Sequence, residues 1–197
     1  MRKWKRVETA RGTRFRSALA PHEAALLKNL SSAMIGLLDN RESSSPPDEL
    51  EEITGIKTGH SQRPVDPTLG RLLPDFYRTD EDGALSGPLD AQAADSLNAA
   101  LRSLHEPEII ESKRVAAQLL SDTIPDKGGR FELTEEAAEA WIAAVNDIRL
   151  TLGVMLDIGP QGPERFPADH PLAPHLEVYQ WLTVLQEYLV LALMGSR

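Results

Sequence analysis

The sequence predicts a mainly α protein: a helical bundle with a small N-terminal β-hairpin. Long stretches repeat apolar residues at the three- and four-residue spacing of amphipathic helices. Segments rich in proline and glycine separate these stretches. Residues 1–19 instead contain runs in which apolar and polar residues alternate, as they do along a strand. Because 197 residues can bury a sizeable core, we expect one domain over residues 1–197.

Residues 1–19 are expected to form a basic β-hairpin. Extended runs at 3–8 and 13–19 flank a turn from Thr9 to Gly12, where glycine supplies a positive φ. In the second run Phe15 and Leu19 occupy alternate positions, so that one face can be buried. An isolated hairpin is marginally stable in water, and this one must therefore pack on the helical body, residues 20–197.

The helical body begins at Pro21, because proline suits the first position of a helix. The apolar spacing extends this first helix to about Asn40. The weaker patterns that follow predict four shorter helices and one acidic loop, with His105 to Pro107 separating the last two helices. The helices are expected over residues 48–54, 67–73, 89–105 and 108–123, and the loop over 79–88.

Two stronger helices complete the body. One begins at Thr134, whose hydroxyl can cap the helix, and the other runs from about Asp169 to Met194. The last helix is apolar on nearly every side, which is typical of the centre of a bundle. Leu26, Trp141 and Trp181 are expected in the core.

The interruption at Pro107 raises a helix-turn-helix as an alternative for residues 89–123. A recognition helix presents cations near its start. Here Lys113 and Arg114 follow three glutamates, which makes the second helix a poor reader of phosphates.

Composition and motifs exclude several classes of function. The formal net charge of −9 argues against a generally basic nucleic-acid binder, and the absence of cysteine excludes thiol catalysis and disulfides. Nucleotide-binding and catalytic motifs are absent. We therefore expect no cofactor and no metal, with Asp169, His170 and His175 as a weak metal-site alternative. The longest apolar run, Tyr188 to Met194, falls far short of the ~20 residues of a membrane span, so a cytoplasmic protein is expected.

The leading segment is the first candidate site. Residues 1–16 hold seven cations and one acid, a local charge of +6, so that the rest of the chain carries −15. Trp4 and Phe15 lie among these cations, a combination that can stack on bases and contact phosphates. The same cations can bind an acidic partner protein or this chain's own acidic body. The candidate partner-binding residues are Arg2, Lys3, Lys5, Arg6, Arg14 and Arg16.

The second candidate site is a polar layer within the two strongest helices. Its members are Asn146, Asp147, Arg149 and Glu187. Buried polar groups require partners, so a structural layer is the ordinary interpretation. Paired carboxylates of Asp147 and Glu187 would instead indicate a small enzyme with an acid–base site.

Several short motifs occur in a specific order and resemble a known family. They are Ala20–Leu27, Asp66–Leu69, Leu72–Tyr77, Leu133–Thr134, Asn146–Gly153 and Trp181–Leu189. Together they resemble the actinobacterial domain-of-unknown-function family that includes the actinomycete oxidative stress regulator AosR.

The resemblance implies a non-enzymatic transcriptional regulator of the oxidative-stress type, acting through contacts with a sigma factor or RNA polymerase. Genes of this family lie near that of the Clp adaptor ClpS, which implies a partner in Clp-dependent proteolysis as the alternative. Redox sensing in the family is attributed to an N-terminal cysteine pair, and it cannot carry over to a chain without cysteine. DNA binding through the basic hairpin and homodimer formation stay open.

Overall fold

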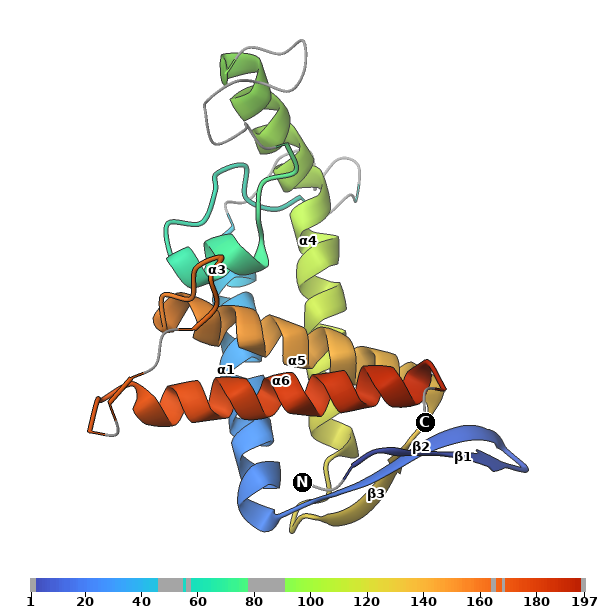
Figure 1. Ribbon diagram of the computed structural model, residues 1–197. Coiled ribbons are helices and arrows are strands. Elements are labelled where there is room, and N and C mark those ends of the chain that lie inside the picture. Colours follow the sequence, from blue (N-terminus) through green and yellow to red (C-terminus); the bar gives the residue numbers. More distant parts are fainter. Residues whose placement is uncertain are drawn as a thin grey trace. The chain divides into compact units, whose positions relative to one another are not determined.

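The structure is a computed structural model that describes residues 3–45, 55, 58–77, 91–163, 166–167 and 169–195. This part of the chain is mainly α, with one small antiparallel sheet (Figure 1), and the predicted fold class is confirmed. Among the described helices, none has the length and apolar character that crossing a membrane requires. The helices are α1 Pro21–Ser43, α3 Pro67–Leu72, α4 Ala91–Thr123, α5 Glu135–Met155 and α6 Ala173–Leu193.

The chain divides into two compact units. The first unit comprises Met1–Gly36 and Lys113–Arg197, and the second comprises Leu37–Ser112. Helices α1 and α4 each contribute residues to both units. That residues 1–197 form a single domain stays a prediction.

The sheet has three antiparallel strands in the order β1-β2-β3, and it belongs to the first unit. Strands β1 (Lys5–Thr9) and β2 (Gly12–Leu19) form the predicted hairpin, and Gly12 has the expected positive φ of 94°. The sequence interpretation missed β3 (Gly129–Leu133), which pairs with β2. Residues 130–133 do alternate polar and apolar residues, but the run is short.

An aromatic cluster attaches the sheet to α5. The Trp4 ring lies edge-on to Phe131 and to Trp141, with ring centres 5.4 and 5.5 Å apart, and Phe131 stacks on Trp141 at 5.3 Å. Trp141 is fully buried, and its Nε1 donates to the hydroxyl of Thr123 at 2.7 Å. Large aromatic surfaces dominate the energetics of such a core, so this cluster fixes which side of the sheet is buried.

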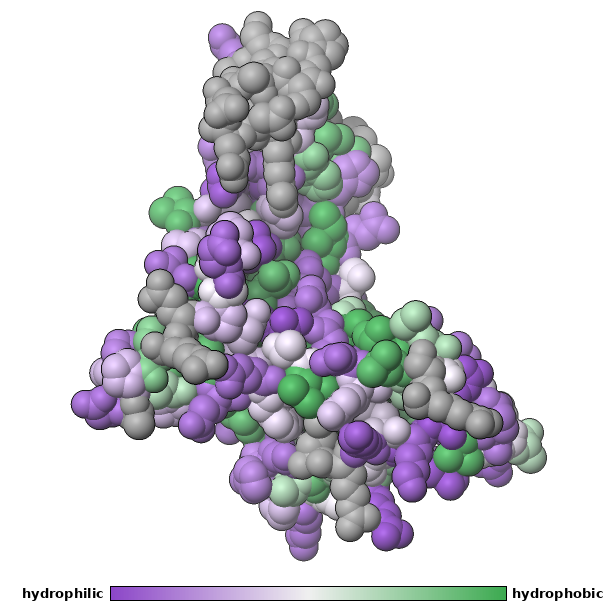
Figure 2. All heavy atoms as spheres, viewed as in Figure 1, coloured by the Kyte–Doolittle hydropathy of each residue, from purple (hydrophilic) through white to green (hydrophobic). Residues whose placement is uncertain are grey.

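Helices α5 and α6 lie side by side in the first unit (Figure 1). The predicted cap of α5 is present, since the Thr134 hydroxyl accepts from the Ala137 N–H at 3.1 Å. The prediction that α6 is buried on nearly every side is wrong. Val184 and Leu191 are each 39% exposed, and apolar side chains reach the surface along α6 (Figure 2). Leu26 and Trp181 are half-buried, whereas Trp141 is in the core as expected.

Helix α4 is continuous, and the prediction of two helices over 89–105 and 108–123 is wrong. Pro107 lacks the N–H that would bond to the Ser103 carbonyl, four residues earlier. The Gly59 N–H, which lies in the same unit, donates to that carbonyl at 2.8 Å instead. The carbonyl is therefore satisfied and the helix persists, which also removes the helix-turn-helix alternative.

The other element boundaries differ little from expectation. Helix α1 ends at Ser43, α3 ends at Leu72, and α6 begins at Ala173, a few residues after Asp169. The predicted helix at 48–54 and acidic loop at 79–88 lie outside the described residues.

Replacing Gly59 with alanine is expected to destabilise the protein. A Cβ at position 59 would lie 2.9 Å from Cδ of Pro107, whose ring cannot rotate away. We expect a loss of about 1–3 kcal/mol in the free energy of unfolding, measured by urea denaturation.

Gly70→Ala is the matched control in the same unit. A Cβ there meets its nearest neighbour, the Pro64 carbonyl oxygen, at an ordinary 3.9 Å, and alanine suits the interior of α3 better than glycine. If both variants have the same stability, the close packing of Gly59 on Pro107 is contradicted.

Candidate protein-interaction surface

The three strands present a cationic side that we call the outer face. Lys5 pairs with Arg16 and Arg16 with Glu132, while Ala18 pairs with Arg130. Directly paired residues of antiparallel strands point to the same side of a sheet. Phe15 and Leu19 point to the other side and are buried. The row that contains Arg16 and Ala18 therefore faces outward. The outer face comprises Lys5, Arg14, Arg16, Ala18, Arg130 and Glu132.

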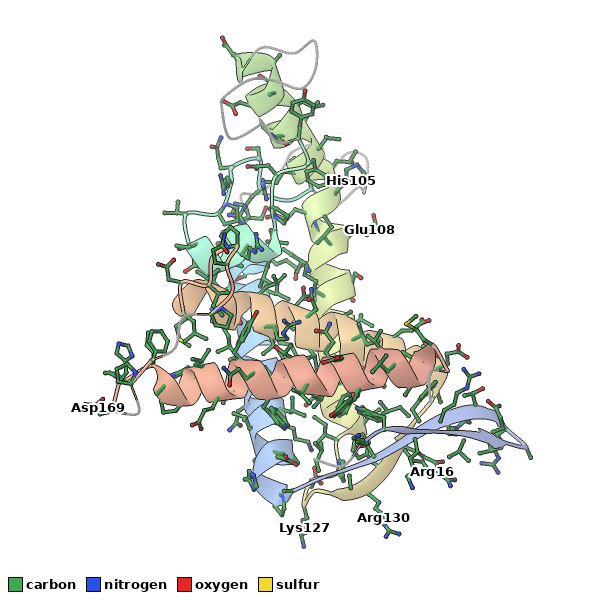
Figure 3. All side chains as sticks on the ribbon, viewed as in Figure 1. Arg16, His105, Glu108, Lys127, Arg130 and Asp169 are labelled. Atoms are coloured by element: carbon green, nitrogen blue, oxygen red, sulfur yellow. The ribbon has the colours of Figure 1, made fainter. Side chains whose placement is uncertain are left out.

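A hollow of 680 Å³ opens on this face. Ala18 is the smallest side chain of its outward row, and longer cationic side chains surround it. Arg16 and Arg130 point away from α5 and α6 (Figure 3). The hollow is lined by Lys3, Lys5, Arg16, Ser17, Ala18, Arg130, Phe131 and Glu132.

The structure separates the six candidate partner-binding residues. Lys5, Arg14 and Arg16 share the outer face, and Lys3 lines the hollow with its Nζ 5.3 Å from the ring centre of Tyr188. Arg2 lies outside the described residues.

Arg6 does not belong with these residues. It pairs with Phe15 and therefore points to the buried side of the sheet. Its Nη1 donates to the Leu193 carbonyl at 3.2 Å, and its Nε donates to Glu8 at 3.2 Å. A cation at the C-terminal end of α6 suits the helix dipole there. Arg6 therefore joins β1 to α6.

Arg130 is the cation that sequence reasoning missed. It lies in β3, far from the basic leading segment, and only strand pairing places it beside Ala18. The alternation of residues 130–133 was the available signal.

The cations of the outer face differ in how far they are already paired. The Arg16 Nε lies 3.0 Å from Glu132, with both side chains about half exposed, so this ion pair contributes little stability. The Arg14 Nη1 donates to the Thr13 carbonyl at 2.9 Å. Within the described part of the chain, Lys5 and Arg130 form no ion pair.

The aromatic residues of the leading segment are not available for base stacking. Phe15 is fully buried and Trp4 is 8% exposed. The nucleic-acid alternative therefore has no exposed aromatic stacking surface at these two residues. The outer face instead presents cationic side chains around the small apolar side chain of Ala18.

The predicted polar layer resolves into two separate contacts. Asp147 is buried, and the Lys113 Nζ donates to it at 2.8 Å. Arg149 faces α6, where its Nη1 donates to Gln186 at 2.6 Å. Asn146 and Glu187 are exposed. Asp147 is thus engaged with α4, and Glu187 lies on the exposed surface of α6.

A further cluster in the second unit had no sequence signal. Arg102 is 2% exposed; its Nη1 lies 2.8 Å from Glu106, and its Nη2 lies 2.7 Å from Asp75. The Arg41 Nε also lies 2.8 Å from Glu106. Because these buried charges are all paired, we interpret the cluster as structural.

Of the two histidines near the start of α6, His175 is exposed and His170 makes ordinary structural contacts. The His170 ring stacks on Phe166 with centres 4.4 Å apart, and its Nδ1 accepts from the Leu172 N–H at 3.2 Å. In the described ranges, no three side chains of His, Asp or Glu gather as a metal site requires.

The comparisons with known proteins confirm the resemblance. The family described as Domain of unknown function (DUF2017) matches residues 1–193. A Mycobacterium tuberculosis protein named "Oxidative stress regulator AosR" is 75% identical over 197 residues, covering this whole chain and 90% of the relative. A Mycobacterium bovis protein of the same name has the same identity and coverage. A Mycobacterium leprae relative is 68% identical over 196 residues. No solved structure matches the chain.

Asp147→Asn is expected to change how stability depends on pH. Burial raises the pKa of the Asp147 carboxyl above its ordinary value of 3.8, and the hydrogen bond and charge of Lys113 only partly oppose this. The folded state therefore binds this proton more tightly than the unfolded chain does. The resulting stabilisation is full below pH 3.8 and is lost as the pH rises through the folded-state pKa.

Urea denaturation of both proteins from acid to neutral pH measures this effect. The free energy of unfolding of the wild type relative to Asp147→Asn is expected to fall as the pH rises from below 3.8 through the folded-state pKa of Asp147. Parallel stability curves over this range would contradict a raised pKa.

Proposed function

We propose, from the premise that this chain belongs to the DUF2017 family, that it is a non-enzymatic regulator in the oxidative stress response. It acts by binding a protein of the transcription machinery, a sigma factor or RNA polymerase, through the outer face. The observation that carries the proposal is the cationic hollow on a chain of net charge −9.

Charge asymmetry supports a protein partner. The hollow holds Lys3, Lys5, Arg16 and Arg130 against one acid, Glu132. Lys5 and Arg130 have no ion pair in the described residues, so they are free to meet carboxylates of a partner. Complementary potentials of this kind accelerate encounter and set the orientation of binding.

DNA is the less favoured partner of the same face. A duplex binder neutralises many phosphates along an extended surface, and this hollow offers four cations with an acidic residue among them. The acidic remainder of the chain repels a polyanion. The buried positions of Trp4 and Phe15 remove the aromatic stacking that would compensate.

The proposed regulator does not sense oxidation through a thiol of its own. The 197 residues contain no cysteine, so no thiol or disulfide of these residues reports oxidation. The proposed role therefore needs no redox step in this chain. Either the switch lies elsewhere, or binding of the partner to the outer face is constitutive.

Capture from a mycobacterial lysate tests the proposal. Wild type and a Lys5→Glu/Arg130→Glu double variant are used as baits, with and without nuclease, and bound proteins are identified by mass spectrometry. We expect a sigma factor or RNA polymerase subunits on the wild type, resistant to nuclease, and a loss of about tenfold or more on the variant. Lys127→Glu is the matched control, because Lys127 is exposed but does not line the hollow.

Each other outcome selects a different function. Capture that disappears with nuclease indicates DNA binding through the hairpin. Clp components in place of transcription proteins indicate the adaptor alternative. Equal capture by the wild type and the double variant refutes the outer face as the contact surface.

A further inference from the structure

We propose that the hollow over Ala18 receives one apolar side chain of an acidic, extended partner segment, while the surrounding cations hold the acidic residues on either side of it. This inference rests on the proposed function and deepens it, because it specifies the chemistry of the partner. The occupant is an extended protein segment in which an apolar residue has acidic residues two positions before and two positions after it.

The floor of the hollow is suited to an apolar group. Ala18 contributes only a methyl group, and its outward neighbours are the long side chains of Lys3 and Arg130. The alkyl stems of lysine and arginine cover apolar surface while their charged ends reach solvent. An apolar side chain entering over Ala18 therefore meets methyl and methylene groups first.

The cations form a rim with a spacing that suits carboxylates. Lys5 lies in β1 and Arg130 in β3, with β2 between them, so the two strands are about 10 Å apart. An extended chain rises about 3.3 Å per residue. In an extended chain the residues two positions before and two positions after a central apolar residue point to the same side as that residue and lie about 13 Å apart. Acidic residues at these two positions can thus reach Lys5 and Arg130 on opposite sides of the rim.

Glu132 makes the site selective. It lies in the lining at 3.0 Å from the Arg16 guanidinium, so Arg16 is already partly neutralised. A dense polyanion would be repelled by Glu132, whereas carboxylates placed at Lys5 and Arg130 avoid it. Phe131 also lines the hollow, but its ring is stacked on Trp141 at 5.3 Å and is not free to stack on a base.

Fluorescence anisotropy with synthetic peptides tests this inference on the full chain. The probe is a fluorescein-labelled peptide with a central phenylalanine and with glutamates two positions before and two positions after it. Its controls are the same peptide with a central alanine and a peptide with lysines in place of the glutamates. We expect the alanine peptide to bind about tenfold more weakly, because the apolar side chain loses its burial, and the lysine peptide not to bind.

A variant of the protein locates the binding. Ala18→Trp covers the floor of the hollow with a bulky side chain without changing its charge, and it is expected to weaken binding of the phenylalanine peptide about tenfold or more. Ala18→Ser is the matched control, since it leaves the space open. Arg130→Glu provides a second variant at an exposed position, for the case that Ala18→Trp does not fold, and it is also expected to weaken binding about tenfold.

The inference is overturned if the alanine and phenylalanine peptides bind equally, or if a folded Ala18→Trp variant binds as the wild type does. It is also overturned if a single-stranded oligonucleotide displaces the peptide at a lower concentration than unlabelled peptide. Failure of the peptide alone, with charge-dependent capture of a transcription protein intact, leaves the proposed function standing. Specific peptide binding without such capture supports the hollow and refutes the proposed function.

Discussion

The aromatic contact of Trp4, Phe131 and Trp141 constrains the rest of the first unit. Trp4 precedes β1 and Phe131 lies in β3, and both rings meet Trp141 of α5. Side chains alternate along a strand, so burying these rings fixes the opposite direction for Lys5 and Arg130. A slip of one residue would bury the cations and expose the rings. The position of the cationic outer face is thus a consequence of aromatic packing.

In the second unit the main constraint is the satisfaction of buried polar groups. Pro107 leaves the Ser103 carbonyl without its helical donor, and the Gly59 N–H replaces that donor at 2.8 Å. Arg102, the residue before Ser103, is buried between Glu106 and Asp75. A buried charge without a partner would cost several kcal/mol. A buried carbonyl without a donor would cost about 1–3 kcal/mol. The segment from residue 58 to 77 therefore supports α4 through specific polar contacts.

The relatives and the outer face are two separate observations behind the proposed function. Relatives at 68–75% identity are named as oxidative stress regulators, and the outer face has the charge expected of a protein-binding surface. Neither observation involves catalytic chemistry. Asp147, the buried carboxyl of the predicted polar layer, is held by Lys113 instead of facing a second carboxyl. The ion pairs inside the units account for the buried charges, whereas Lys5 and Arg130 of the hollow form no ion pair within the described residues.

The sequence by itself determined what depends on neighbours along the chain. The spacing of apolar residues located the helices, Thr134 marked the cap of α5, and Gly12 marked the hairpin turn. The motifs identified the family. The tertiary structure alone decided three features: that β3 joins the hairpin and brings Arg130 to the hollow, that Arg6 faces α6, and that α4 continues through Pro107. Each depends on a partner distant in sequence, and the periodicity of a segment does not identify the partner with which that segment pairs or packs.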